Sequence, residues 1–496
     1  LLARPDALDD SARILLRVAA AHMSSSELAG ALATAAASRR RIAGRDRAIL
    51  EAALARELAW AGRQDSASRV AAALSAGARG PERGLADSVR SRTVAPRQGP
   101  LVLGAILPTS GRYQVVGSWL REGIELGLEE AAAGGAPRVR LRVVDEGDDP
   151  AAVPGLVRQL EREGAVAVLG PVRSRALADA ADARTDPGLA LVSPTATDAP
   201  ARGAGAFPLN AYALWDSRRR QADAVRDLGR WLGSRVGVDD AAILFARNPG
   251  GRDEALAFRA GLAGAAGSGA VASAAFDPDS TTFRGPIARV GAFGPTAVFV
   301  AGGTSATLLQ LAPQLSYFGA GGALVAGGPG WAEPGVVRRL EPSPTQERIV
   351  ATYLDWSDPE SGWSRFRASY EKKYGKSLGN NVVPGLGYDA ARLLVAALPE
   401  DGVPHARAVT RRLAALSGLE GATGTLSPDA SSATVARRTL IRVIEDRRLS
   451  PADPDSVKAW VRRSGFLEAV SLRRQRAAAR QAVRDATPDS TPGGRP

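Results

Sequence analysis

Residues 101–135 read LVLGAILPTSGRYQVVGSWLREGIELGLEEAAAGG, and they decide the fold class of this 496-residue chain. The apolar run LVLGAIL (101–107) precedes a Pro/Ser/Gly turn and a long helical stretch, and such runs fit strands buried on both faces of a parallel sheet. We predict an α/β fold, and since roughly ten strands are too many for one compact open sheet, we predict two lobes. Six further runs repeat the alternation: VRLRVVD (139–145), AVAVLG (165–170), LALVS (189–193), AAILFA (241–246), TAVFVAG (296–302) and ALVAGG (323–328).

The two ends of the chain follow other patterns. Residues 1–92 place apolar side chains at helical spacing, as at Leu50, Leu54 and Leu58, which predicts a small all-α domain, with short antiparallel helices that suggest a helical-repeat fragment. Residues 93–100 are polar and contain proline, so we interpret them as a linker. Within residues 453–496 we predict a basic helix around Leu472 to Arg484, which we interpret as a solvated face rather than a surface-binding element, and then a disordered tail.

Composition excludes several classes of enzyme. The chain has no Cys and only two His, His22 and His405, so thiol nucleophiles, disulfides and Cys-rich zinc sites are excluded, and a Ser-His-Asp triad nearly so. No apolar run reaches the roughly 18 residues of a membrane-spanning helix. Because the chain begins at Leu1 and its only Met is Met23, we expect a processed product that has lost a signal or lipid-attachment segment.

The net charge of +12 raises the question of a nucleic-acid partner. Nearly all of the basic residues are Arg, and Ala and Gly are abundant, as GC-rich coding produces. No aromatic-rich RNA-binding or helix-turn-helix signature accompanies the charge. We therefore expect no nucleic-acid partner.

Motifs for nucleotides, calcium and nucleophilic catalysis are incomplete. The GKS at 375–377 lacks the glycine of a phosphate-binding loop, because position 370 is Tyr370. The acidic stretch DEGDD (145–149) has Leu156 where a calcium loop needs Glu, and no G-x-S-x-G elbow occurs. We expect no cofactor, no metal and no enzymatic activity.

Segments in order along the chain resemble the leucine-binding family of type I periplasmic binding proteins, which serve ABC importers of branched-chain amino acids and related solutes. Besides residues 103–135, these are VRLRVVDEGDDPAAVPGLVRQL (139–160), AVAVLGPVRS (165–174), LALVSPTATD (189–198), FRASYEKKYGKSLGNNVVPGLGYDAARLLVAAL (366–398) and TGTLSPD (423–429). The resemblance covers roughly residues 100–450. It implies a two-lobed type I periplasmic-binding fold, a periplasmic location and an ABC permease as partner.

By the same resemblance, the binding domain spans residues 101–452. The first lobe takes about 101–212 and 346–425, and the second takes about 213–345 and 426–452. The lobes of this family close like a hinge on a ligand that touches both, so that binding changes the overall shape.

The family resemblance also suggests how a ligand is held. Amino-acid binders of this family hold the α-carboxylate with hydroxyls that correspond to Ser174, Thr195 and Thr197. A helix that starts at Ser174 points free N–H groups and its positive dipole end at an anion, which suits a small carboxylate-bearing ligand. The alternative is that Ser174 only caps its helix and Thr197 only stabilises a turn.

Other positions of the family's pocket differ here. The expected aromatic is Val116, the expected tyrosines fall near Gly250 and at Thr304, and the expected acidic residue is Pro329. A ligand ammonium group then has no obvious partner, and burying it unpaired costs several kcal/mol. Substitutes near the predicted cleft are Tyr113, Tyr212, Trp215, Asp253, Trp331 and Glu333, although each aromatic also suits a packing role. Our candidate ligand-binding residues are Ser174, Thr195, Thr197, Tyr113, Tyr212, Trp215, Thr304 and Trp331.

The helical front domain leaves a second function open. Its position ahead of a type I binding fold is similar to the architecture of penicillin-binding protein activators, which are outer-membrane lipoproteins that stimulate peptidoglycan synthases. Under this alternative the partner is a cell-wall synthase, and a lipid anchor attached to a removed N-terminal segment holds the protein at the membrane.

Overall fold

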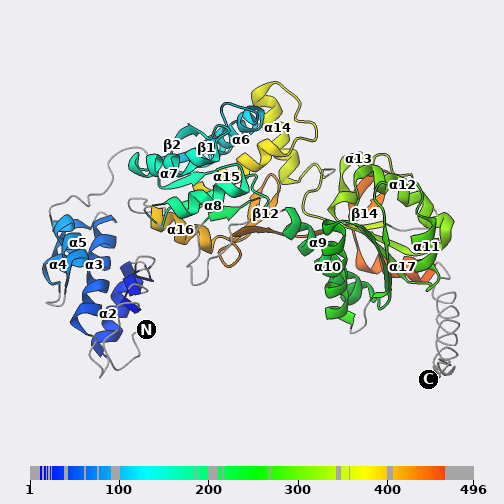
Figure 1. Ribbon diagram of the computed structural model, residues 1–496, viewed down its shortest axis with the longest axis horizontal. Coiled ribbons are helices and arrows are strands. Elements are labelled where there is room, and N and C mark those ends of the chain that lie inside the picture. The colour runs from blue at the N-terminus through cyan, green and yellow to red at the C-terminus, as the bar shows by residue number, and fades with distance from the viewer. Residues whose placement is uncertain are drawn as a thin grey trace, which may run out of the picture. The chain divides into compact units, whose positions relative to one another are not determined.

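The structure of the chain is a computed structural model. From residue 101 onward its helices and strands alternate, as the apolar runs predict (Figure 1). It separates into two compact units, of which unit 1 is Leu1–Asp216, Asn381–Gly421 and Leu426–Ala436, and unit 2 is Ser217–Asn380, Ala422–Thr425 and Arg437–Pro496. The structure describes residues 12–13, 16–17, 19–20, 23, 25–37, 43–60, 63–74, 78–90, 101–184, 186, 188–198, 211–214, 217–266, 270–341, 348–356, 358–398 and 406–463.

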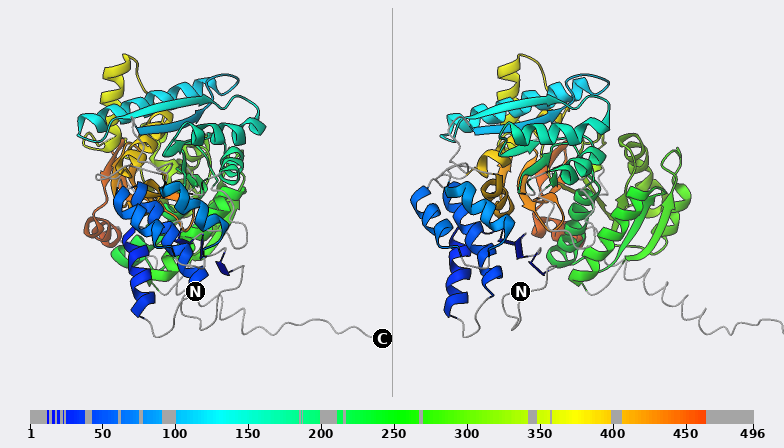
Figure 2. Two further views of the ribbon diagram at one scale, coloured as in Figure 1. Left: turned by 90° about the vertical axis from the view of Figure 1, so that its left-hand side faces the viewer. Right: turned by 60° about the vertical axis from the view of Figure 1, so that its left-hand side comes forward.

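Among the described residues before the first strand, all regular secondary structure is helical, which confirms that the front of the chain is all-α. The central helix is α3, whose side chains from Ile49 to Ala59 are almost all buried. The other three pack around it or against one another, and the bundle is visible from two sides in Figure 2. The helices are α2 (Ser25–Ala37), α3 (Gly44–Trp60), α4 (Gln64–Ala72) and α5 (Gly80–Arg90).

The α/β part of unit 1 is built on an eight-stranded sheet in the order β11-β12-β13-β5-β4-β3-β1-β2. Strands β1 to β5 pair in parallel, so their carboxyl ends lie at one edge of the sheet. The strands are β1 (Leu101–Leu107), β2 (Val139–Asp145), β3 (Ala167–Leu169), β4 (Ala190–Ser193), β5 (Ala211–Ala213), β11 (Leu419–Gly421), β12 (Gly424–Asp429) and β13 (Thr434–Arg437).

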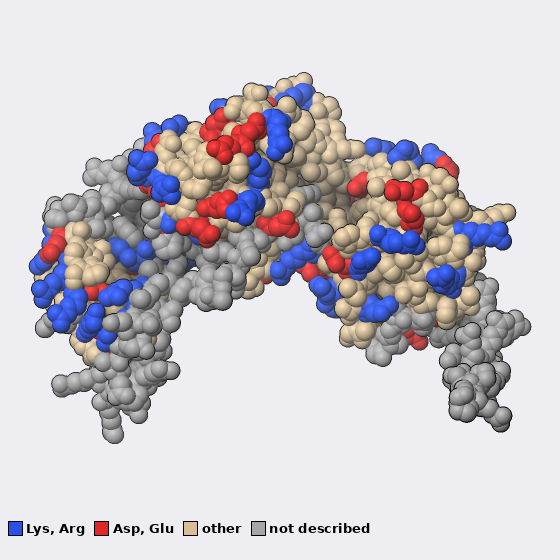
Figure 3. All heavy atoms as spheres, viewed as in Figure 1, with Lys and Arg blue, Asp and Glu red and all other residues tan. Residues whose placement is uncertain are grey.

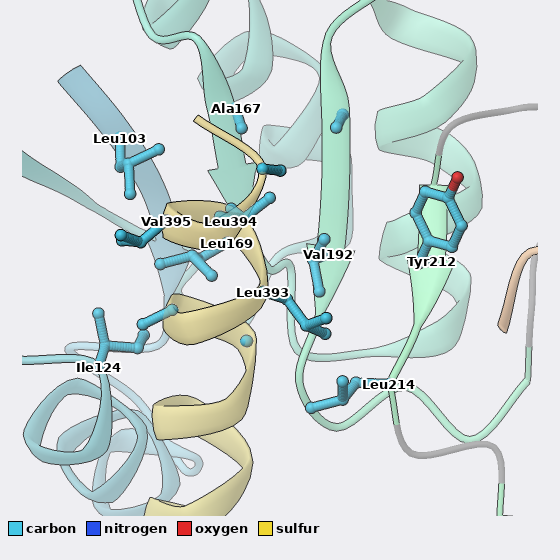
Figure 4. Close-up of a cluster of buried hydrophobic side chains, with 14 of the residues drawn as sticks. Leu103, Ile124, Ala167, Leu169, Val192, Tyr212, Leu214, Leu393, Leu394 and Val395 are labelled. Carbon is cyan, nitrogen blue, oxygen red and sulfur yellow. The ribbon is translucent and has the colours of Figure 1, made fainter. Parts of the chain in front are cut away.

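Helices cover both faces of this sheet. On one face α6, α15 and α16 bury side chains such as Ile124, Leu393 and Leu413 against β1, β3 and β4, and Figure 4 shows this core. On the other face α7 and α8 bury a second, separate set. The helices of unit 1 are α6 (Gln114–Ala133), η1 (Pro150–Ala152), α7 (Val153–Arg162), α8 (Ser174–Ala183), α15 (Val383–Ala396) and α16 (Ala406–Ala415).

Unit 2 is built on a seven-stranded sheet in the order β15-β14-β10-β9-β8-β6-β7. Strands β6 to β10 pair in parallel, whereas β14 and β15 are antiparallel additions at one side. The strands are β6 (Ala241–Ala246), β7 (Ala270–Phe276), β8 (Ala297–Ala301), β9 (Leu324–Gly327), β10 (Arg348–Thr352), β14 (Leu440–Glu445) and β15 (Arg448–Pro451).

Helices cover both faces of the second sheet as well, again with two separate cores. Helices α9, α10 and α17 lie on one face, and α11 and α12 lie on the other. The helices of unit 2 are α9 (Ser217–Trp231), η2 (Leu232–Val236), α10 (Pro249–Ala266), α11 (Arg284–Gly291), α12 (Ser305–Leu315), η3 (Ser316–Ala320), η4 (Pro329–Ala332), α13 (Pro334–Val337), α14 (Gly362–Tyr374) and α17 (Pro454–Arg463).

The borders of the two units differ from the expected lobe borders in two main places. Residues 346–380, which we expected in the first lobe, lie in unit 2, and residues 426–436, which we expected in the second lobe, lie in unit 1. The reason is strand pairing, because β10 adds to the second sheet between β9 and β14, and β13 pairs with β5 in the first sheet. The expected linker (93–100), the basic helix expected around residues 472–484 and the tail lie outside the described residues, whereas residues 454–463 of the C-terminal segment form α17.

Surface charge and hydropathy add two observations. Over the visible face of the two α/β units, basic and acidic residues are interspersed (Figure 3). Within the described residues, no helix is both long enough and apolar enough to cross a membrane.

Candidate ligand-binding site

In unit 1, polar side chains gather where β3 and β4 end. Ser174 begins α8, and its Oγ accepts hydrogen bonds from the backbone N–H groups of Thr197 (3.1 Å) and Asp198 (3.2 Å). Thr195 donates its hydroxyl to the carbonyl of Val172 at 2.9 Å. The structure therefore brings Ser174, Thr195 and Thr197 together at the ends of β3 and β4.

These hydrogen bonds give Ser174 a structural role at the start of α8. The residue before α8 is Arg173, which makes no side-chain cap, and Ser174 joins the start of α8 to the loop after β4. Both Ser174 and Thr197 reach solvent at least in part, and their hydroxyl oxygens lie 3.3 Å apart. The pair is thus pre-ordered at the strand ends, where open α/β sheets bind ligands.

Arg173, the residue before Ser174, is bound by the segment that follows β2. Its Nε donates to the Glu146 carboxylate at 2.9 Å, and its Nη1 donates to the carbonyl of Asp148 at 3.0 Å. Glu146 is buried and also accepts from the backbone N–H of Val172 at 2.8 Å. Arg173 is therefore committed to positioning the loop that leads into α8.

The neighbouring turn after β1 is organised by Asp145. Its carboxylate accepts from the Ser110 hydroxyl and from the backbone N–H groups of Thr109 and Gly147. These hydrogen bonds, chiefly that of Ser110, lower the pKa of Asp145 to about 2. Asp145 is thus ionised at neutral pH and adds negative charge to this edge of unit 1.

In unit 2, the carboxyl ends of β6, β8 and β9 surround a pocket of about 230 Å³. Gly302 and Gly303 turn the chain after β8 with φ of +69° and +94°, a conformation that favours glycine. Gly327 leaves room for the ring of Trp331, since a Cβ there would lie 2.3 Å from the indole Cδ1. The lining residues are Gln221, Asn248, Gly250, Gly251, Glu254, Val300, Gly302, Gly303, Leu308, Gly328, Gly330, Trp331 and Glu333.

Glu254 is the buried ionisable group of this pocket. It lies on α10 with only 9% of its surface exposed, and its Oε2 accepts from the backbone N–H of Gly302 at 2.8 Å. Burial raises the pKa of Glu254 to about 7, with a smaller upward contribution from Asp253 and a downward one from the Gly302 hydrogen bond. The second acidic lining residue, Glu333, accepts from the Ser305 hydroxyl.

The remaining predicted site residues have different places. Trp331 is buried and lines the unit 2 pocket, whereas Thr304 caps α12 and accepts from the N–H of Thr307. Tyr212 lies in the core of unit 1 (Figure 4), where burial raises its pKa to about 12. Tyr113 is half-buried at the start of α6, with Arg112 over its ring. Trp215 lies outside the described residues.

Sequence reasoning missed Glu254 and proposed its neighbour Asp253, which is exposed. The available signal was helical spacing, because Glu254 shares a face of α10 with the buried Ala257 and Phe258. A carboxyl group on a buried helical face is unusual enough to mark a functional candidate. Among the described residues, no cluster of His, Cys, Asp or Glu is arranged to hold a metal ion.

Two parallel-sheet units with polar groups at their strand ends define a two-lobed type I binding fold preceded by helices. The sequence matches the family model described as periplasmic binding protein over residues 100–445, so the chain belongs to that family. No curated protein sequence matches it.

Solved structures agree on the fold. A putative branched-chain amino acid ABC transporter from Rhodospirillum rubrum is 20% identical, with 71% of this chain and 100% of that chain covered and a TM-score of 0.59. An ABC transporter substrate-binding protein from Sphaerobacter thermophilus is also 20% identical, with 72% and 97% covered and a TM-score of 0.52. At these identities the likeness establishes the two-lobed architecture, which confirms the predicted fold class.

Proposed function

We propose that this chain is the non-enzymatic substrate-binding component of an ABC importer, which closes its two lobes on a small solute in the periplasm. The observation that carries the proposal is the pre-ordered Ser174–Thr197 pair at the strand ends of a periplasmic binding fold. The unit 2 pocket supports it, because it lies at the carboxyl ends of parallel strands and has polar and apolar walls.

In this proposal, Ser174, Thr195 and Thr197 hold an oxygen-rich end of the solute, for which a carboxylate is the first candidate. The hydroxyls of Ser174 and Thr197 supply donors, and the ten-residue helix α8 begins at Ser174 with its positive dipole end. Trp331 contributes one wall of the unit 2 pocket.

The test is a thermal-shift screen of the full chain against amino acids, small carboxylates and peptidoglycan fragments, followed by titration calorimetry of each hit. We expect Ser174→Ala combined with Thr197→Ala to weaken a hit by about tenfold to a hundredfold, the value of one or two ligand hydrogen bonds. Ser88→Ala, at a half-buried serine of α5, is the matched control. A hit that survives the double substitution unchanged contradicts the assignment of this site.

A second candidate function is stimulation of a peptidoglycan synthase, and the observation that favours it is the helical bundle at residues 25–90. Under this alternative, the periplasmic binding fold binds a protein partner rather than a solute. A pull-down of purified synthase with the full chain, and with a chain lacking residues 1–92, tests it. Retention that depends on residues 1–92, together with no solute hit, favours this alternative.

A further inference from the structure

The described lining of the unit 2 pocket contains carboxyl groups and no basic side chain. Two of its lining residues, Glu254 and Glu333, have carboxyl groups, and none of the described lining residues is Lys, Arg or His. A buried carboxylate without a cationic partner is costly, because the protein interior solvates a charge poorly. When Glu254 is ionised, no positive charge among the described lining residues compensates its negative charge.

The geometry of Glu254 leaves one carboxyl oxygen for a ligand. Oε2 accepts from the N–H of Gly302, and the carboxyl group lies against Gly328, where a Cβ would be 3.4 Å from Oε2. Within the described part of the chain, no hydrogen bond engages Oε1. Glu254 lines the pocket, so its carboxyl group is available to an incoming hydrogen-bond donor.

We propose that Glu254 is a specificity-determining residue of the unit 2 pocket, which accepts a protonated amine or amidinium group of the ligand. This inference rests on the proposed solute-binding function and names the chemical class of the solute. A cationic nitrogen supplies both the hydrogen-bond donor and the charge that Glu254 lacks, whereas a neutral hydroxyl supplies only the donor.

Binding of such a solute is expected to depend on pH, and the charged groups around Glu254 set the direction. Asp253 on α10 and Glu333 after β9 are acidic, and the facing residue of α9 is the neutral Gln221. Arg220 on α9 lies over the ring of Tyr353 and is not a lining residue. A cationic solute favours ionised Glu254, so its affinity is highest above about pH 7 and falls as Glu254 takes up a proton.

The experiment uses titration calorimetry on the full chain with matched probes. L-leucine, isocaproate and isoamylamine share a carbon skeleton and differ in whether they carry the carboxylate, the amine or both, and L-arginine and agmatine extend the set to a guanidinium group. Each probe is titrated into wild type, Glu254→Gln, Glu254→Asp and Glu341→Gln at about pH 8 and about pH 5.5. Glu341 is an exposed carboxylate of unit 2 outside the pocket lining, so its substitution controls for total charge.

We expect at least one amine-bearing probe to bind wild type, to bind Glu254→Gln at least about tenfold more weakly, and to retain binding to Glu254→Asp and Glu341→Gln. Below about pH 7 its affinity for wild type falls by up to about tenfold per pH unit, and this fall is absent in Glu254→Gln. Binding of isocaproate as tight as that of the amines, or amine binding that Glu254→Gln leaves unchanged, overturns this inference and leaves the proposed function standing. Failure of every probe and of every solute in the wider screen overturns both.

Discussion

At the scale of single residues, two buried carboxyl groups have opposite environments. Glu146 accepts from a backbone N–H and pairs with Arg173, whereas Glu254 accepts from one backbone N–H and has no basic residue among the described residues that line its pocket. Buried charges are tolerated when they are paired and hydrogen-bonded, so the contacts of Glu146 stabilise its loop, whereas ionisation of Glu254 opposes folding.

The Glu254 environment predicts a pH-dependent stability difference that needs no ligand. Its pKa rises from 4.5 in the unfolded chain to about 7 in the fold, so ionisation penalises the folded state from about pH 4.5 upward and fully above about pH 7. We expect Glu254→Gln to be more stable than wild type by up to about 3 kcal/mol at pH 8 and equally stable near pH 4. Urea unfolding at a series of pH values measures this, and a difference that is flat with pH contradicts it.

The Glu146 environment predicts the opposite effect of removal. Glu146→Ala leaves the N–H of Val172 and the guanidinium of Arg173 without their acceptor, which we expect to cost about 3 kcal/mol. The control is Glu163→Ala, because Glu163 pairs with Arg142 at the surface and its loss is expected to cost less than about 1 kcal/mol. Chemical denaturation compares the two, and equal losses would contradict a special role for Glu146.

At the scale of elements, the closest helix packing in unit 1 joins α6 and α15. A Cβ on Gly123 of α6 would lie 1.8 Å from the carbonyl oxygen of Pro384, and one on Gly387 of α15 would lie 2.3 Å from that of Leu120. Small residues on both helices thus let the backbones approach. This packing holds α6 and α15 over the face of the sheet that Figure 4 shows.

Substitution at this crossing separates packing from helix propensity. Gly123→Ala is expected to destabilise the protein by about 2 kcal/mol or more, because the added methyl group forces α6 and α15 apart. Gly155→Ala in the exposed first turn of α7 meets no atom within 4 Å and is expected to be neutral or to stabilise by up to about 1 kcal/mol. Thermal unfolding of both variants checks the sign of each effect.

At the scale of the whole molecule, each α/β unit has its own cores, with no residue shared between them. The front helices belong with unit 1, where Glu57 of α3 lies 3.7 Å from Arg411 of α16. Burial raises the pKa of Glu57 above its usual value, although the surrounding arginines offset part of this rise. Separate cores imply that one unit can lose stability without the other.

This independence is testable with one substitution in each unit. Ile124→Ala and Phe299→Ala each remove a fully buried side chain, and each is expected to cost its own unit about 3 kcal/mol or more. Hydrogen exchange followed by mass spectrometry at increasing urea concentration assigns the loss to peptides of one unit. Equal loosening of both units by either substitution indicates a single cooperative molecule instead.

The sequence by itself determined the α/β class, most parallel strands and the polar turn at Ser174. These features depend on the spacing of apolar residues and on turn residues, which act over short distances along the chain. It missed β7 (Ala270–Phe276), whose small Ala and Ser side chains give a weak apolar signal, and it assigned residues 346–380 to the other lobe. Strand β10 joins the second sheet by pairing with β9 and β14. A long crossover separates β9 from β10, and β14 lies far from β10 in sequence.

Only the tertiary structure decided the composition of the unit 2 pocket. Its walls come from the ends of β6, β8 and β9, which meet because the sheet aligns them, and no local pattern records that α10 turns Glu254 toward Gly302 and Gly328. The same holds for Tyr212, which a loop position made a ligand candidate and which the sheet places in the core. The strand LVLGAIL (101–107) was determined by its local sequence, whereas the charge of the pocket depends on contacts between segments that are distant in sequence.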